Sequence, residues 1–141
     1  MAKIILTDAG FWLGLVDPKD QFHESSNTIA EMIEGYNILF PWPCLYETIS
    51  TYLVRRRERL LYLEKFIKRP NIFLFDDKDY KLTVLEEVFQ LNRISGFTYS
   101  LTDSVIREIL KDINVKVNYL VTFNDEDFKD LCSMRKIEII N

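Results

Sequence analysis

The sequence has few of the residues on which several kinds of site depend. Its 141 residues include one histidine, His23, and two cysteines, Cys44 and Cys132. These three residues cannot supply the ligand set of a tetrahedral zinc site, so we expect two free, buried thiols. His23 lies in a polar segment and is expected at the surface before a helix. That placement argues against a Ser-His-Asp or Cys-His catalytic group.

Long apolar runs are also missing. Stretches such as residues 4–6 and 38–40 are far shorter than the roughly 20 apolar residues that span a bilayer. The N-terminus lacks the apolar region and cleavage site of a secretory signal, so we expect a cytoplasmic protein with no membrane segment. Glycine and proline are scarce, with 4 of each, and no repeat or linker-like stretch interrupts the chain. Residues 1–141 are therefore expected to form a single domain.

Positive charge is in deficit overall but locally concentrated. The formal net charge of −4 argues against binding nucleic acid through the overall field of the protein. Seven of the 18 lysines and arginines nevertheless fall between Arg55 and Arg69. Arginine suits phosphate oxygens, so Arg55, Arg56 and Arg57 are candidates for contacts with a nucleic-acid backbone. The alternative is an ordinary solvated helix face.

Short apolar strands alternate with longer amphipathic helices along the chain. Strands that are apolar on both faces and separated by helices are typical of a parallel sheet covered on both sides. The sequence therefore predicts an α/β fold, a three-layer α/β/α sandwich with a central parallel sheet of about five strands. The expected strands cover residues 3–8, 37–40, 72–75, 118–122 and 137–140. The expected helices cover 10–15, 26–36, 43 into the arginine cluster, 59–68, 78–93, 102–113 and 125–134.

Acidic residues recur at the ends of strands and the starts of helices. Asp8 ends the first strand, Glu47 lies about one turn into a helix, and Asp103 opens another helix. Asp125 and Asp127 follow the fourth strand, at the edge where a parallel sheet holds its ligands. Several carboxylates in one pocket repel each other unless a cation binds, and hard divalent cations prefer oxygen ligands. The pattern predicts a site for Mg²⁺ or Mn²⁺, although Asp103 and Asp125 could alternatively cap helices.

The order of these motifs resembles the PIN domain over essentially the whole chain. The motifs are Asp8 after the first strand, Glu47 early in a helix, Asp103 in a Ser-Leu-Thr-Asp helix start, and Thr-Phe-Asn-Asp-Glu-Asp-Phe at 122–128. The chain is most similar to the compact bacterial PIN ribonucleases, including the VapC-type toxins of toxin–antitoxin pairs. The resemblance implies a Mg²⁺- or Mn²⁺-dependent endoribonuclease that cleaves RNA by metal-activated water. It also implies a cognate antitoxin and a homodimer.

The fourth acidic position departs from the family pattern. The family commonly has Thr, any residue, Asp, two further residues, and then Asp or His before Phe. Here Asn124 stands at the first of these positions and Asp127 at the second, while Asp125 is a reserve ligand or a helix cap. The resemblance thus implies Asp127 as the fourth catalytic acid, with Asn124 ligating through its carbonyl oxygen. Thr102 and Thr122 are expected to orient the ligands through hydrogen bonds.

Two other functions fit parts of the same pattern. A PIN-like module could bind RNA or a partner protein without cleaving, and the uncharged Asn124 favours that alternative. A phosphatase or receiver-like α/β domain also places acids at strand ends. Such a domain typically has a second acid beside the first-strand acid, and no paired acid accompanies Asp8 there. The receiver-like alternative therefore ranks lower.

Overall fold

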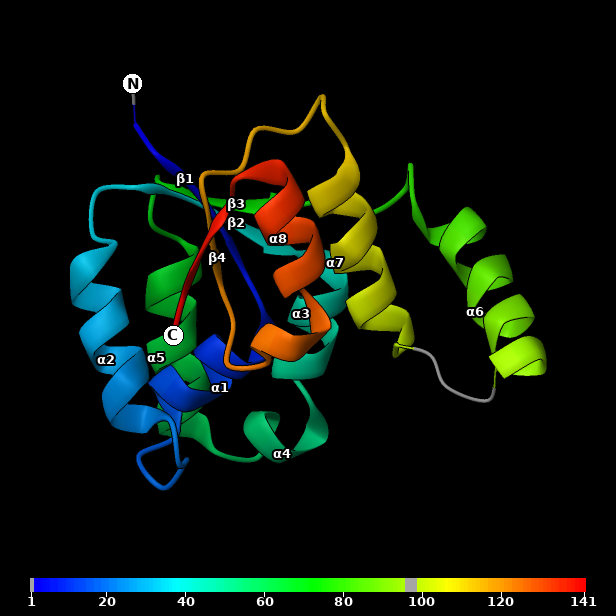
Figure 1. Ribbon diagram of the computed structural model, residues 1–141. Coiled ribbons are helices and arrows are strands. Elements are labelled where there is room, and N and C mark those ends of the chain that lie inside the picture. Colours follow the sequence, from blue (N-terminus) through cyan, green and yellow to red (C-terminus); the bar gives the residue numbers. More distant parts are fainter. Residues whose placement is uncertain (1, 96–98) are drawn as a thin grey trace.

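The computed structural model describes residues 2–95 and 99–141, Ser95 by its backbone alone (Figure 1). Within these residues, five strands form one parallel sheet in the order β3-β2-β1-β4-β5. The strands are β1 (Ile4–Thr7), β2 (Asn37–Pro41), β3 (Ile72–Phe75), β4 (Tyr119–Val121) and β5 (Glu138–Ile140). The predicted parallel sheet is confirmed.

Strand β1 lies at the centre of the sheet and carries its most buried residues. Ile5 pairs with Ile38 of β2, and Leu6 pairs with Leu120 of β4. Ile5 and Leu6 point to opposite faces, and both are fully buried. Helices must therefore cover the sheet on both sides, which is why the central strand reads as an unbroken apolar run.

The direction in which the chain crosses the sheet decides which helices cover each face. The chain moves outward from β1 through β2 to β3 and then returns to β4 and β5. Right-handed crossovers in opposite directions place their helices on opposite faces. Helices α1 (Ala9–Val16), α2 (His23–Met32) and α5 (Arg57–Ile67) lie together on one side, and α7 (Leu101–Lys111) and α8 (Lys129–Arg135) on the other (Figure 1). The predicted three-layer sandwich is confirmed.

The remaining helices lie at the edges of this sandwich. Helices α3 (Trp42–Thr48) and α4 (Thr51–Val54) follow the carboxyl end of β2. Helix α6 (Lys81–Ser95) packs against α7 on the outside of its layer (Figure 1). A short 3₁₀ helix, η1 (Asp125–Asp127), connects β4 to α8. None of the helices in the described chain combines the length and the apolar character needed to cross a bilayer.

A group of aromatic and hydroxyl side chains fixes α1 against the central strands. The Trp12 ring stacks on Phe40 of β2 with centroids 4.5 Å apart. Its indole N–H donates to the Thr7 hydroxyl oxygen at 2.9 Å, and that hydroxyl donates to the carbonyl of Leu39 at 2.8 Å. Thr7 thus ties α1, β1 and β2 together immediately before Asp8. The backbone that leads into Asp8 is therefore fixed by these contacts.

Two expected helices differ from the structure in ways that affect the site. The helix that begins near Pro43 does not continue into the arginines, because Ile49 leaves the helical region with φ −90° and ψ 64° and a new helix begins at Thr51. The helix expected from Asp125 starts as η1, and α8 begins only at Lys129. Phe128, fully buried between them at φ −136°, interrupts the helical path.

Candidate functional site

The chain reverses its course across the sheet between β1 and β4, and Asp8 lies at that point. In open parallel sheets, ligands bind beyond the carboxyl ends of the strands where the order reverses. The Asp8 backbone N–H donates to the carbonyl of Val121 at 3.1 Å. Its carboxylate accepts the Ala9 N–H at 2.7 Å and the Thr122 hydroxyl at 3.0 Å. Both oxygens of Asp8 are therefore held, one by the start of α1 and one by the residue after β4.

Burial and nearby charge oppose ionisation of Asp8. Its side chain is only 5% exposed, and burial is the main reason that its pKa is raised. The hydrogen bonds from Ala9 and Thr122 lower the pKa in part, while the negative charges of Glu47 and Asp127 raise it again. The Thr122 hydroxyl thus donates to Asp8, while its expected role in orienting a metal ligand stays a prediction.

Burial and nearby negative charge also oppose ionisation of Asp103, which lies on α7 in the opposite helix layer. It lies in the first turn of α7, where its N–H donates to the Ser100 side-chain oxygen at 3.0 Å. Ser100 therefore caps this helix, and the Asp103 carboxylate does not. Burial, followed by the charges of Asp8 and Asp127, raises the pKa of Asp103 to about 6. The negative charges of Asp8 and Asp127 thus lie close enough to Asp103 to oppose its ionisation.

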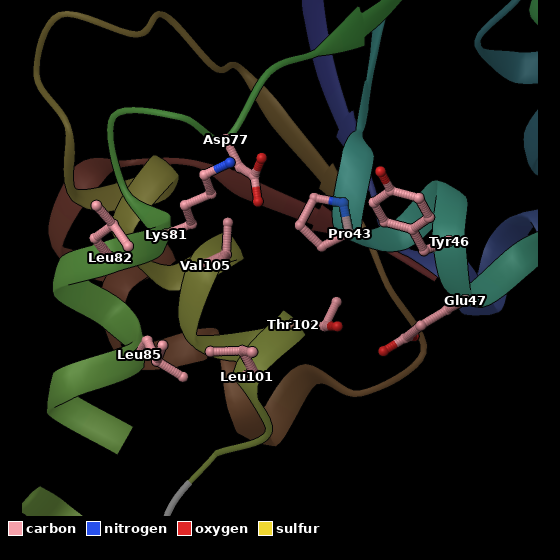
Figure 2. A pocket seen from close by; sticks show the side chains of 10 residues that line it. All are labelled: Pro43, Tyr46, Glu47, Asp77, Lys81, Leu82, Leu85, Leu101, Thr102 and Val105. Carbon is pink, nitrogen blue, oxygen red and sulfur yellow. The ribbon is translucent and has the colours of Figure 1, made fainter. Parts of the chain in front are cut away.

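Among Asp8, Glu47, Asp103 and Asp127, Glu47 alone is exposed. It projects from α3, and its negative charge raises the pKa of both Asp8 and Asp103. Together with Thr102 it also lines a cavity of about 500 Å³ between α3, α6 and α7. Figure 2 shows α6 contributing Leu82 and Leu85 to this cavity, across from Glu47. The expected role of Thr102 in orienting a ligand stays a prediction.

The polar residues of the segment after β4 differ in their partners. The Asn124 N–H donates to Thr122 Oγ1 at 3.0 Å, and its side chain is exposed. The Asp125 carboxylate accepts from the Asn141 amide at 2.6 Å and is not among the charges that raise the pKa of Asp8. Asp127 is among those charges. The charge of Asp127 therefore acts on Asp8 and Asp103, while the ligand roles of Asn124, Asp125 and Asp127 stay predictions.

Arg107 holds this segment in place and was not among the residues expected at the site. Its Nη1 donates to the Asp127 carbonyl at 2.7 Å, and its guanidinium binds both Asp130 carboxylate oxygens at 2.9 and 2.8 Å. That pairing lowers the pKa of Asp130 to about 2. Arg107 follows Asp103 by one turn of α7. The four-residue spacing from Asp103, which puts both residues on one face of the helix, is the sequence signal that could have pointed to Arg107.

The thiols lie where they were expected, whereas the histidine is half-buried and not on the surface ahead of a helix. Cys44 and Cys132 are free and buried, as predicted. Burial raises the pKa of Cys44 well above its usual value, as do the charges of Asp8 and Glu47, so the thiol stays protonated next to Asp8. His23 begins α2, and its Nδ1 lies 2.8 Å from the carbonyl of Gly14. Its position in the α1–α2 contact gives it a structural role.

The three candidate arginines lie where α4 passes into α5. Arg55 and Arg57 are exposed. The guanidinium carbon of Arg56 lies 3.4 Å from the centroid of the Tyr52 ring. Their proposed contact with RNA stays a prediction.

The oxygen donors of this edge suit a hard divalent cation. In residues 2–95 and 99–141, no three His, Cys, Asp or Glu side chains are arranged to enclose one metal ion. Mg²⁺ does not require such an enclosure, because it keeps several waters and usually takes one or two carboxylates. A cation among Asp8, Glu47 and Asp103 would also offset the repulsion that raises the pKa of Asp8 and Asp103. The residues therefore fit Mg²⁺ or Mn²⁺.

Comparison with solved structures identifies the fold. No known family profile matches the chain, and no curated protein sequence does either. The structure is similar to Mycobacterium tuberculosis VapC20, a sarcin–ricin loop cleaving toxin, with a TM-score of 0.68 and 16% identity over 89% of this chain and 94% of that one. It is also similar to VapBC2 from Rickettsia felis, bound to a DNA fragment from their promoter, with a TM-score of 0.61 and 15% identity over 96% of each chain. The chain has a VapC-like PIN fold, which confirms the resemblance inferred from the sequence at the level of the fold.

The raised pKa values predict how the metal-free protein responds to pH. Asp103 binds its proton more tightly in the folded state, so folding takes up protons between the ordinary value of 3.8 and about 6. The free energy of unfolding should therefore fall as the pH rises through this range. We expect Asp103→Asn to reduce that fall and to stabilise the protein at neutral pH, as measured by urea unfolding in EDTA. The exposed Glu126→Gln should keep the wild-type profile, and an unchanged profile in Asp103→Asn would contradict the prediction.

Proposed function

We propose that this chain is a metal-dependent endoribonuclease of the VapC toxin type. The observation that carries the proposal is the electrostatic coupling of Asp8, Glu47, Asp103 and Asp127 at the edge where a parallel sheet holds its ligands. The shared fold with two VapC proteins supports it. Asp8 follows β1, Glu47 lies on α3, Asp103 on α7 and Asp127 in η1, which follows β4.

Each acid has its own part in the proposed site. Asp8, Glu47 and Asp103 would hold Mg²⁺ or Mn²⁺, and Asp127 with the Asn124 carbonyl oxygen would complete the set. A divalent ion bound there supplies Lewis-acid stabilisation of the charge that develops on the phosphate. Thr122 keeps the Asp8 carboxylate in one orientation, since its hydroxyl donates to Oδ2.

A second candidate is a PIN-like module that binds RNA or a partner protein without cleaving. Asn124 supports this alternative, because it removes one negative charge from the position where the family has an acid. Calorimetric titration with Mn²⁺ separates the two candidates. A nuclease of the proposed kind takes up the ion, with release of protons from Asp103, whereas a binding module need not.

Cleavage of a mixed RNA pool tests the nuclease directly. We expect cleavage with Mn²⁺ and none in EDTA. Asp8→Asn and Asp103→Asn should each lose more activity than the about 10–100-fold typical for a residue that only orients a ligand, and Thr122→Val should fall within that range. Glu126→Gln, an exposed acid paired with Lys129, is the matched control and should keep full activity. Undiminished cleavage by Asp8→Asn or Asp103→Asn would overturn the assignment.

The arginines at the α4–α5 junction are proposed to contact the RNA backbone. Each phosphate contact to a single strand contributes about 0.7 to the slope of log affinity against log salt concentration. Replacing Arg55, Arg56 and Arg57 together with glutamine should therefore lower the slope by about 2. Filter binding of labelled single-stranded RNA over a range of salt concentrations measures it. An unchanged slope would mean that these arginines are an ordinary solvated surface.

The cavity beside Glu47 is proposed to receive the antitoxin. Leu82, Leu85, Leu101 and Val105 line it together with Glu47. An amphipathic helix docks by placing its apolar face in such a groove. The neighbouring carboxylates favour a helix that carries a basic residue next to its apolar face. A homodimer, which the resemblance also implies, and a cytoplasmic location stay predictions.

Two substitutions on α6 test this docking site. We expect Leu85→Glu, within the cavity, to abolish co-purification with any small DNA-binding protein that an adjacent reading frame encodes, because it places a charge against the apolar face of the docked helix. Ile94→Glu is the control, since Ile94 is 83% exposed and does not line the cavity. Equal loss in both variants, or retention in both, would contradict the assignment. RNA cleavage by Leu85→Glu should persist in the absence of the partner.

A further inference from the structure

A second cavity shares Glu47 with the apolar one but differs in chemistry. Its volume is about 280 Å³, and it lies between the end of α1, the α3–α4 connection and the start of α5. Tyr52 and Arg59 line it together with Glu47, and Asp17 and Asp20 close it from the loop after α1. The volume is just below the roughly 300–1,000 Å³ of typical small-molecule sites, so it suits one nucleoside rather than a longer segment.

The aromatic wall of this cavity is held in one orientation. Arg56 covers the Tyr52 ring at 3.4 Å and donates from Nη1 to the Tyr52 carbonyl at 2.7 Å. Arg59 Nη1 lies 3.3 Å from the Tyr52 hydroxyl oxygen and donates to it. The Tyr52 side chain nevertheless stays 51% exposed. An exposed ring that is already fixed can stack on a base with little further loss of conformational freedom.

The charges around the cavity favour a base over a phosphate. Arg59 pairs with Asp17 at 3.3 Å, and each side chain is 20% exposed. With that pair neutralised and Glu47 assigned to the metal ion, Asp20 adds a further negative charge, so the cavity offers a phosphate no net positive charge. Both contacts of Arg59 use Nη1, and its other two nitrogens have no hydrogen-bond partner in the described chain. Arginine donors and carboxylate acceptors are the groups that read the edges of nucleobases.

We infer that this cavity binds the base of a nucleotide adjoining the cleaved phosphodiester bond. The inference rests on the proposed nuclease function and states where one base of its RNA substrate binds. Tyr52 provides the stacking surface, and the free nitrogens of Arg59 donate to acceptors on the edge of the base. Glu47, which is common to the cavity and to the acidic group, places that base directly beside the reacting phosphate.

Binding of RNA in EDTA tests the cavity without any cleavage. The probe is a fluorescently labelled single-stranded RNA of mixed sequence, measured by anisotropy. We expect Tyr52→Leu to weaken binding roughly fivefold or more, which is the lower end of the contribution of one stacked base. Tyr46→Leu is the aromatic control, because Tyr46 is exposed on α3 but lines the other cavity. Unchanged binding by Tyr52→Leu, or a loss only in Tyr46→Leu, would overturn the inference.

Sequencing the products of a randomised RNA pool tests the role of Arg59. With Mn²⁺, the wild-type protein should prefer particular bases at one position next to the cleaved bond. Arg59→Gln should reduce that preference by roughly fivefold or more. Arg69→Gln is the matched control, because it removes a guanidinium that lies over Phe66 at 4.2 Å, beyond the other end of α5. Equal preference in wild type and Arg59→Gln would overturn the assignment.

The two assays separate failure of the cavity from failure of the nuclease. Cleavage by the wild-type protein that neither Tyr52→Leu nor Arg59→Gln alters would leave the nuclease standing and remove the base site. Weaker binding by Tyr52→Leu in a protein that never cleaves RNA would retain base binding by the cavity but remove both the nuclease and the placement of the base beside a cleaved bond. Circular dichroism melting of each variant confirms that it is folded before either assay is interpreted.

Discussion

The buried carboxylate of Asp8 is the constraint on which the rest of the structure depends. A charge removed from water costs free energy unless hydrogen bonds and opposite charges replace the lost hydration. Asp8 receives hydrogen bonds from Ala9 and Thr122, yet the other acids around it are negative. Its surroundings are therefore those of an anion that lacks a counter-charge. A divalent cation supplies that charge, so ion binding and stability of this edge should be linked.

The contacts that fix Asp8 are made by buried residues of the core. Thr7 precedes it and joins Trp12 to β2 through two hydrogen bonds, and Trp12 stacks on Phe40. On the opposite side, Arg107 fixes the segment that carries Asp127 against α7. Contacts from both sides of the sheet thus fix the backbone next to an acid, through Trp12 of α1 for Asp8 and through Arg107 of α7 for Asp127.

The features that the sequence predicts best are those governed by local pattern. Strands such as Ile4–Thr7 are recognisable because both faces are buried, and an acid directly after such a strand must lie at the carboxyl edge. Local pattern does not determine that Ile49 ends α3 or that Phe128 interrupts the helix after β4, because tertiary packing decides both. It also cannot separate Asp125 from Asp127, whose different surroundings arise from contacts with Asn141 and Arg107 far along the chain.

Glu47 differs from the other acids in what surrounds it, and this difference suggests how the proposed functions fit together. Asp8 is buried and held at both oxygens, whereas Glu47 is exposed and forms part of two cavities. One cavity is mainly apolar and suits the face of a partner helix; the other is polar and suits a base. A partner helix that carries a basic residue would compete with a metal ion for Glu47 without occupying the base site. The partner would then block cleavage by taking Glu47 from the metal ion. RNA could still occupy the Tyr52 cavity in that state.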